Sequence, residues 1–133
     1  MNDLEDIVFT YKEHTAYIKI NRPPNNFFDS DLIRQIADVL EEMDKKKDCR
    51  SIILFSEGKH FCAGADFSRS NFKNESDAYS ALYDQAVRLF RTSKPIIAVI
   101  QGAAVGGGLG VALAADFRIC LLYTSDAADE SSS

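Results

Sequence analysis

The chain has 133 residues, of which 46% are hydrophobic and 26% charged, with 15 basic and 20 acidic side chains. This composition is typical of one ordinary soluble domain and excludes a disordered or fibrous chain. The net charge of -5 argues against a protein that binds nucleic acid or an anionic membrane, because such affinity comes mostly from a basic surface. The three cysteines lie far apart without metal-ligand spacing, so we expect no metal site and a cytoplasmic protein.

The first half of the chain alternates between strand and helix patterns. Apolar residues at every second position predict a β-hairpin over residues 7–20, with Glu13 and His14 in its turn. Residues 21–26 (NRPPNN) predict a stiff turn, because adjacent prolines fix φ and remove two backbone donors. Asp29 or Ser30 then caps a helix that ends at the lysines 45–47, and residues 51–56 (SIILFS) predict a strand buried on both faces. The apolar stripe of this helix consists of Leu32, Ile33, Ile36, Val39, Leu40 and Met43.

The second half continues the same alternation. Ser76 or Asp77 caps a second helix, which we expect to continue to Lys94, the residue before Pro95. Residues 96–100 (IIAVI) predict the next buried strand, residues 102–108 a glycine-rich turn that leads into a short helix, and residues 117–119 one more strand. This order predicts an α/β unit with parallel crossovers. The apolar face of the second helix consists of Tyr79, Leu82, Tyr83, Ala86, Leu89 and Phe90.

Residues 95–115 also fit a different structure, a membrane helix. The stretch is apolar, and Gly102, Gly106 and Gly110 form the small-xxx-small series of membrane helix dimers. Its five glycines and its strand-like beginning favour the strand, turn and short helix instead.

Two glycine-rich turns follow the predicted buried strands, residues 62–66 (CAGAD) and residues 106–110 (GGGLG). If they converge, they can point two backbone N–H groups at one oxygen, which is the geometry of an oxyanion hole. The alternative is that the glycines only let a helix pack closely on a strand. Dinucleotide, phosphate-loop and nucleophile-elbow motifs are all incomplete. His60 and Cys62, two residues apart, predict a solvated histidine and a buried apolar cysteine rather than a thiol–imidazole pair.

Three segments resemble the N-terminal signatures of the crotonase family, the enoyl-CoA hydratase/isomerase superfamily. They are NRPPNN (21–26), GKHFCAGADF (58–67) and KPIIAVIQGAAVGGGLGVALAADFRI (94–119). The resemblance implies an α/β crotonase-like (ClpP/crotonase) spiral of ββα turns, truncated before the C-terminal helical part. It implies an acyl-CoA substrate, with coenzyme A as part of the substrate and no separate cofactor, and a full-length parent that forms a trimer or hexamer.

The resemblance also implies roles for particular residues. The backbone amides of Ala65 and Gly107 would form the oxyanion hole that stabilises a thioester enolate. Hydratases of the family carry a glutamate two residues after the last glycine of GGG, where this chain has Gly110. The resemblance therefore implies either an enoyl-CoA hydratase/isomerase-like enzyme or a non-catalytic or catalytically altered acyl-CoA-binding homologue. The implied substrate contacts are Arg22, Ala63, Gly64, Asp66, Gly106 and Gly110.

The last residues differ in character from the rest. Residues 120–130 (CLLYTSDAADE) show no amphipathic period and resemble the translation of a transposase-type sequencing adapter. We therefore expect residues 1–119 to be the N-terminal part of the domain and residues 120–133 to be a non-native tail, in which Glu130 falls by chance where the family has its second glutamate. Without the three acids of this tail the chain has 15 basic and 17 acidic side chains, a net charge of -2. We expect the fragment itself to be inactive.

Overall fold

The computed structural model describes residues 4–121, and in that range the predicted order of strands and helices is confirmed. The part of the predicted tail from residue 122 on, including Glu130, lies outside the described residues. The elements are β1 (Ile7–Lys12), β2 (Thr15–Ile20), α1 (Ser30–Lys45), β3 (Ser51–Ser56), α2 (Glu75–Leu89), β4 (Ile96–Ile100), α3 (Gly107–Ala114) and β5 (Phe117–Cys120).

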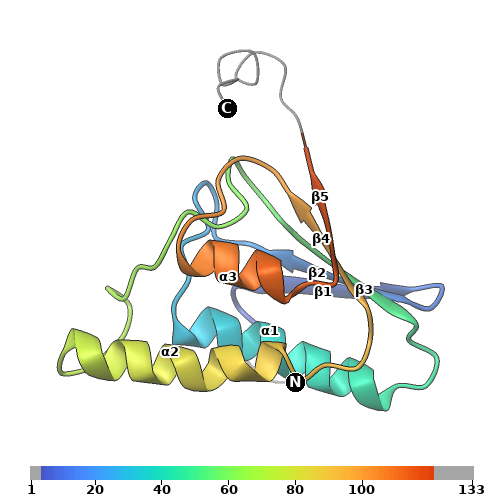
Figure 1. Ribbon diagram of the computed structural model, residues 1–133, viewed down its shortest axis with the longest axis horizontal. Helices are drawn as coiled ribbons and strands as arrows, with labels where there is room; N and C mark the ends of the chain where they lie inside the picture. Colours follow the sequence, from blue (N-terminus) through green and yellow to red (C-terminus); the bar gives the residue numbers. More distant parts are fainter. Residues whose placement is uncertain (1–3, 122–133) are drawn as a thin grey trace.

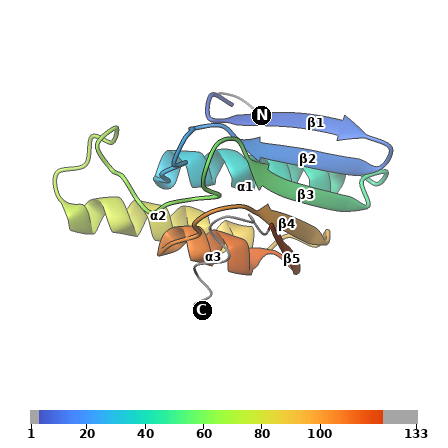
Figure 2. The same cartoon turned by 90° about the horizontal axis from the view of Figure 1, so that it is seen from above.

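The five strands form one sheet in the order β1-β2-β3-β4-β5. β1 and β2 form the predicted antiparallel hairpin, and Glu13 and His14 occupy its turn with left-handed φ values of 50° and 72°. The pairs β2–β3, β3–β4 and β4–β5 are parallel, which confirms the predicted crossovers. Each crossover contains one helix, and α1 and α2 lie side by side below the sheet (Figure 1). Seen from above, α3 lies beside β4 and β5 (Figure 2).

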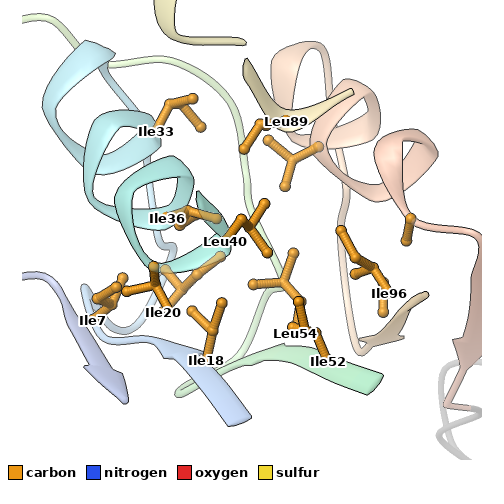
Figure 3. Packing of buried hydrophobic residues seen from close by; sticks show 14 of the residues in the cluster. Ile7, Ile18, Ile20, Ile33, Ile36, Leu40, Ile52, Leu54, Leu89 and Ile96 are labelled. Atoms are coloured by element: carbon orange, nitrogen blue, oxygen red, sulfur yellow. The ribbon is translucent and has the colours of Figure 1, made fainter. Parts of the chain in front are cut away.

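The core lies between α1 and one face of the sheet (Figure 3). Strand register explains this face, because Ile18 pairs with Leu54, which in turn pairs with Ala98, so their side chains point the same way. Ile36 and Leu40 of α1 cover these strand residues, and the whole predicted apolar stripe of the helix is buried. Asp29 is the N-cap, and its side chain accepts a hydrogen bond from the Leu32 amide.

The expectation that β3 and β4 are buried on both faces is wrong. Ile52, Leu54, Ile96 and Ala98 are buried, but every second residue of both strands is only half-buried. The physical reason is that the helices of the described residues cover one face of the sheet and leave the other open.

The predicted limits of α2 are also wrong. Asn74, rather than Ser76 or Asp77, is the N-cap, and its side chain accepts a hydrogen bond from the Asp77 amide at 2.9 Å. The helix ends at Leu89, well before Pro95, because the chain must turn back toward the sheet. Asp44 of α1 fixes this turn by accepting hydrogen bonds from the side-chain hydroxyls of Thr92 and Ser93.

The apolar stretch 95–115 is divided between β4, a loop and the eight-residue helix α3. Within residues 4–121, no helix combines the length and apolar character needed to cross a membrane.

Candidate active site

The loops that follow β2, β3 and β4 meet at one edge of the sheet, because these three strands are parallel and end on the same side. The CAGAD loop and the glycine-rich turn are joined directly by a parallel bridge between Cys62 and Ala104. The Cys62 amide donates to the Ala103 carbonyl at 3.0 Å, and the Val105 amide donates to the Cys62 carbonyl at 3.0 Å. The segment that leads into the 106–110 turn therefore lies beside the CAGAD loop, which is the arrangement that the oxyanion-hole interpretation requires.

A second bridge, between Phe28 and Ala65, determines which way the Ala65 amide points. The Phe28 amide donates to the Gly64 carbonyl at 2.9 Å, and the Asp66 amide donates to the Phe28 carbonyl at 3.0 Å. Peptide groups alternate in direction along an extended segment, so the N–H of Ala65 points away from residue 28. Ala65 is exposed, and it lines a cavity to which Phe28 also contributes.

The other predicted amide, that of Gly107, belongs to the first residue of α3. The first N–H groups of a helix have no partner within the helix, and the helix dipole favours negative charge beside them. Gly107 lies three residues after Ala104, just as Ala65 lies three residues after Cys62. Each of the two amides therefore lies three residues after the bridge residue of its own segment.

The glycines beside these amides are required by the backbone rather than by close packing. Gly64 has φ +123°, and Gly106 has φ 55° and ψ -120°, conformations that L side chains rarely adopt. A Cβ atom at Gly64, Gly106 or Gly110 would meet no heavy atom within 4 Å. The alternative that these glycines only allow close packing is therefore wrong at all three positions.

A cavity of about 630 Å³ lies beside the two turns. Gly64, Ala65, Gly106 and Gly110 line one end of it, and no carboxylate lines it among the residues that the structure describes. The apolar face predicted for the second helix belongs partly to the core, through the buried Leu82 and Leu89, and partly to the wall of the cavity, where Tyr83 is 68% exposed. All six residues of that face line the cavity: Tyr79, Leu82, Tyr83, Ala86, Leu89 and Phe90.

Arg22, a predicted substrate contact, lies in a network of charged groups outside this cavity. Its guanidinium donates to Asp6 at 2.7 Å, to Asp29 at 3.1 Å and to the Phe27 carbonyl at 3.0 Å. Burial by itself would raise the pKa of Asp6, but hydrogen bonds from Arg22 and Gln35 and the charge of Arg22 lower it. Arg22 also lines a separate polar cavity of about 290 Å³.

Ala63 and Asp66 make local contacts in the loop. The Ala63 amide donates to the Asn25 carbonyl at 2.9 Å, and the exposed Asp66 accepts a hydrogen bond from the Ser68 amide at 2.9 Å. The Ser68 hydrogen bonds lower the pKa of Asp66. In the structure Asp66 thus stabilises the turn that follows it.

The prediction of a buried apolar cysteine at position 62 is confirmed. Burial disfavours the thiolate and raises the pKa of Cys62 to about 11, against smaller opposing contributions from the Gly64 amide and Arg22. The prediction of a solvated histidine is wrong, because His60 is half-buried and its Nδ1 accepts a hydrogen bond from the Ala103 amide at 2.9 Å.

One residue that holds the site together was not singled out in the sequence. Asn26 is fully buried, and its side chain accepts from the Arg22 amide at 2.8 Å and donates to the carbonyls of Glu57 and His60. It thereby fixes the loop after β2 to the loop after β3. The signal in the sequence was the second asparagine of NRPPNN, a residue type that tolerates the left-handed conformation seen here, with φ 53°.

A family profile described as "Enoyl-CoA hydratase/isomerase" matches residues 10–128. The Bacillus subtilis protein YngF, whose name assigns it provisionally to the enoyl-CoA hydratases/isomerases, is 38% identical over 121 residues, covering 86% of this chain and 46% of that protein. The (E)-benzylidenesuccinyl-CoA hydratase of Thauera aromatica is 36% identical over 117 residues, covering 85% of this chain and 46% of that protein. The solved structure of Pseudomonas aeruginosa DspI is similar with a TM-score of 0.80 at 31% identity, covering 90% of this chain and 47% of that one. The chain thus spans about half the length of the relatives it matches.

Proposed function

Because the chain belongs to the enoyl-CoA hydratase/isomerase family, we propose that it is part of an enzyme that binds an acyl-CoA thioester and stabilises the enolate of that thioester. In this proposal the backbone amides of Ala65 and Gly107 donate hydrogen bonds to the thioester oxygen. The observation that carries it is the bridge between Cys62 and Ala104, which joins the two glycine-rich turns beside an apolar cavity.

The chemistry follows from where charge develops. When a base removes a proton from the carbon next to a thioester carbonyl, the carbonyl oxygen gains negative charge, and donors already aimed at that oxygen lower the barrier. Fixed backbone amides need no reorganisation during the step, and removing one such donor typically costs about 10² to 10³ in rate. The glycines at positions 64 and 106 leave the approach to these donors free of Cβ atoms.

The cavity supports an apolar acyl group as the occupant beside the two amides. Its walls are aromatic and aliphatic side chains, and burying an acyl chain there contributes about 0.8 kcal/mol per methylene. An acyl group that carries a free carboxylate would lose the hydration of that charge in the cavity, and no cationic side chain among the described lining residues would compensate for it. Gly64, Gly106 and Gly110 would then contact the acyl end. Arg22 and Ala63 stay predictions for contacts with the coenzyme A part, and Asp66 stays a prediction for a substrate contact.

A second candidate function is favoured by Gly110. This residue lines the cavity where hydratases of the family are expected to carry a glutamate, so one of the two carboxylates that activate water is absent. A one-base isomerase, or a homologue that binds acyl-CoA without catalysis, is compatible with this glycine. The isomerase would need a base from another part of the protein, since no carboxylate among the described residues lines the cavity.

The proposal is tested by binding. Isothermal titration of the full chain should show tighter binding of octanoyl-CoA than of S-octyl-CoA, a thioether that carries the same length of chain but lacks the thioester carbonyl. Gly107→Pro removes one N–H at the first position of a helix, where proline is tolerated, so it should abolish this preference and leave the helix in place. Gly110→Ala is the matched control in the same helix and should keep the preference. Equal affinity of the unmodified chain for both ligands would refute the proposal.

The two candidates are separated by activity. A hybrid with residues 1–119 from this chain and the remainder from YngF supplies the half of the domain that the chain does not span. Hydration of crotonyl-CoA that appears only in the Gly110→Glu form of the hybrid would favour the homologue that lacks the first glutamate. The open space around Gly110 allows this side chain. Hydration by the hybrid with Gly110 unchanged would exclude the second candidate.

A further inference from the structure

We propose that His60 is a positioning residue whose imidazole ring sets the spacing between the two turns that carry the Ala65 and Gly107 amides. This inference rests on the proposed function of those amides. It assigns a role to a side chain that does not itself touch the substrate.

The contact joins one turn to the other. His60 Nδ1 accepts a hydrogen bond from the Ala103 amide at 2.9 Å. The bridge beside it uses the carbonyl of Ala103 and the amide of Val105, so the imidazole ring binds the Ala103 N–H, which the bridge does not use. Because Nδ1 is the acceptor, the proton of the neutral ring is assigned to Nε2.

The backbone of His60 is held from the opposite side. Its amide donates to the Pro24 carbonyl at 3.2 Å, and its carbonyl accepts from the Asn26 side chain at 2.7 Å. The loop after β2 therefore fixes the histidine, and the ring extends from this support to the loop after β4. A side chain fixed in this way can hold Ala103 at a defined distance from the CAGAD loop.

The backbone segments around His60 and Gly102 lie very close to each other. A Cβ atom at Gly102, which has φ +60°, would lie 2.2 Å from the Lys59 carbonyl oxygen and 2.6 Å from His60 Nδ1. The Phe61 amide donates to the Gln101 carbonyl at 2.8 Å, which begins the pairing that continues to the bridge. Loss of the ring contact leaves the Ala103 amide without its acceptor and allows the loop after β4 to shift against the CAGAD loop. Such a shift would move Gly107 relative to Ala65.

The chain offers a matched control for this histidine. His14 also uses Nδ1 in a hydrogen bond, with the Asp48 carbonyl at 2.9 Å, but it is exposed in the turn of the β-hairpin. The experiment uses the full chain with three variants. His60→Ala removes the acceptor, His60→Asn keeps an oxygen acceptor near the position of Nδ1, and His14→Ala removes the other histidine.

The measured quantity is the ratio of the affinities for octanoyl-CoA and S-octyl-CoA, because both ligands carry a chain of the same length and only the first has a thioester oxygen. Since one hydrogen bond contributes about 0.5 to 1.5 kcal/mol, we expect His60→Ala to reduce this ratio about threefold to tenfold. His60→Asn should restore most of the ratio, and His14→Ala should leave it unchanged. If His60 had only a structural role, its replacement would weaken the binding of both ligands equally and leave the affinity ratio unchanged.

A coupling between the 15N nuclei of the Ala103 amide and His60 Nδ1, transmitted through the hydrogen bond, tests the contact directly by NMR. If the unmodified chain shows no preference for octanoyl-CoA, the proposed function fails and this inference fails with it. If the unmodified chain shows the preference and His60→Ala retains it, only the inference about His60 is overturned. Absence of the coupling in the unmodified chain would also overturn it.

Discussion

Replacing Asn26 with alanine should destabilise the chain more than any exposed substitution in the same loop. The Asn26 side chain makes three hydrogen bonds to backbone groups of two loops, and the residue is 0% exposed. Alanine removes all three hydrogen bonds. The expected result is a large loss of unfolding free energy, measured by urea denaturation followed by circular dichroism.

The magnitude follows from the partners that are left behind. The His60 carbonyl also accepts from the Ser56 hydroxyl, so it keeps one hydrogen bond. The Arg22 amide and the Glu57 carbonyl lose the Asn26 side chain, and a buried backbone group left unpaired costs about 1 to 3 kcal/mol. Alanine is also disfavoured by roughly 1 kcal/mol at the left-handed φ of 53°. The sum is a loss of about 3 to 7 kcal/mol.

Two further variants separate these contributions. Asn26→Gly removes the side chain but tolerates the left-handed backbone, so it should recover roughly 1 kcal/mol relative to alanine. Asn25→Ala is the matched control, because Asn25 contributes its backbone carbonyl to the loop contact, and we expect a change within about 0.5 kcal/mol. The reasoning is refuted if Asn26→Ala costs under about 1 kcal/mol, since the loops would then be held by their backbone contacts alone.

Three other predictions concern backbone, thiol and carboxylate chemistry. Gly106→Ala should destabilise the chain by about 1 to 3 kcal/mol because of its positive φ, whereas Gly110→Ala in the helix should stabilise it by roughly 0.5 to 1 kcal/mol, both measured by urea denaturation. A thiol reagent at pH 8 should modify the exposed Cys120 and spare Cys62, whose pKa is raised to about 11; rapid labelling of Cys62 in folded protein would contradict its burial. The pKa of Asp6 is lowered from 3.8, so its ion pairing stabilises the fold above that pH, and this stability should disappear as the pH falls through the lowered pKa. The drop in the urea midpoint below pH 4 should be smaller in Asp6→Asn, and an equal drop would show that this carboxylate does not contribute.

The sequence by itself determined the order and type of the elements. Alternation in the first twenty residues and the 3.6-residue stripe of α1 are local patterns, and each depends only on which side of a strand or helix must avoid water. The glycine-rich turns were also visible, because positions such as Gly64 and Gly106 need a backbone that other residues rarely adopt. Their place after strands left open whether they meet, and the bridge between Cys62 and Ala104 shows that the segments leading into them lie side by side.

Local sequence patterns did not predict the contacts of residues whose partners lie far away in the chain. The sequence showed that α2 has an apolar face, but only the packed structure divides that face between the core, with Leu89, and the wall of a cavity, with Tyr83. The end of α2 was set by Asp44 of another helix rather than by the proline ahead of it.

The polar residues that join the loops show the same limit. Asn26 and His60 act on backbone groups up to 43 residues away, and the spacing of one short motif contains no information about those partners. Hydrophobic periodicity reports only whether a side chain faces water. The direction of a single hydrogen bond depends on how three loops come together at the edge of the sheet, which is decided only when the tertiary structure forms.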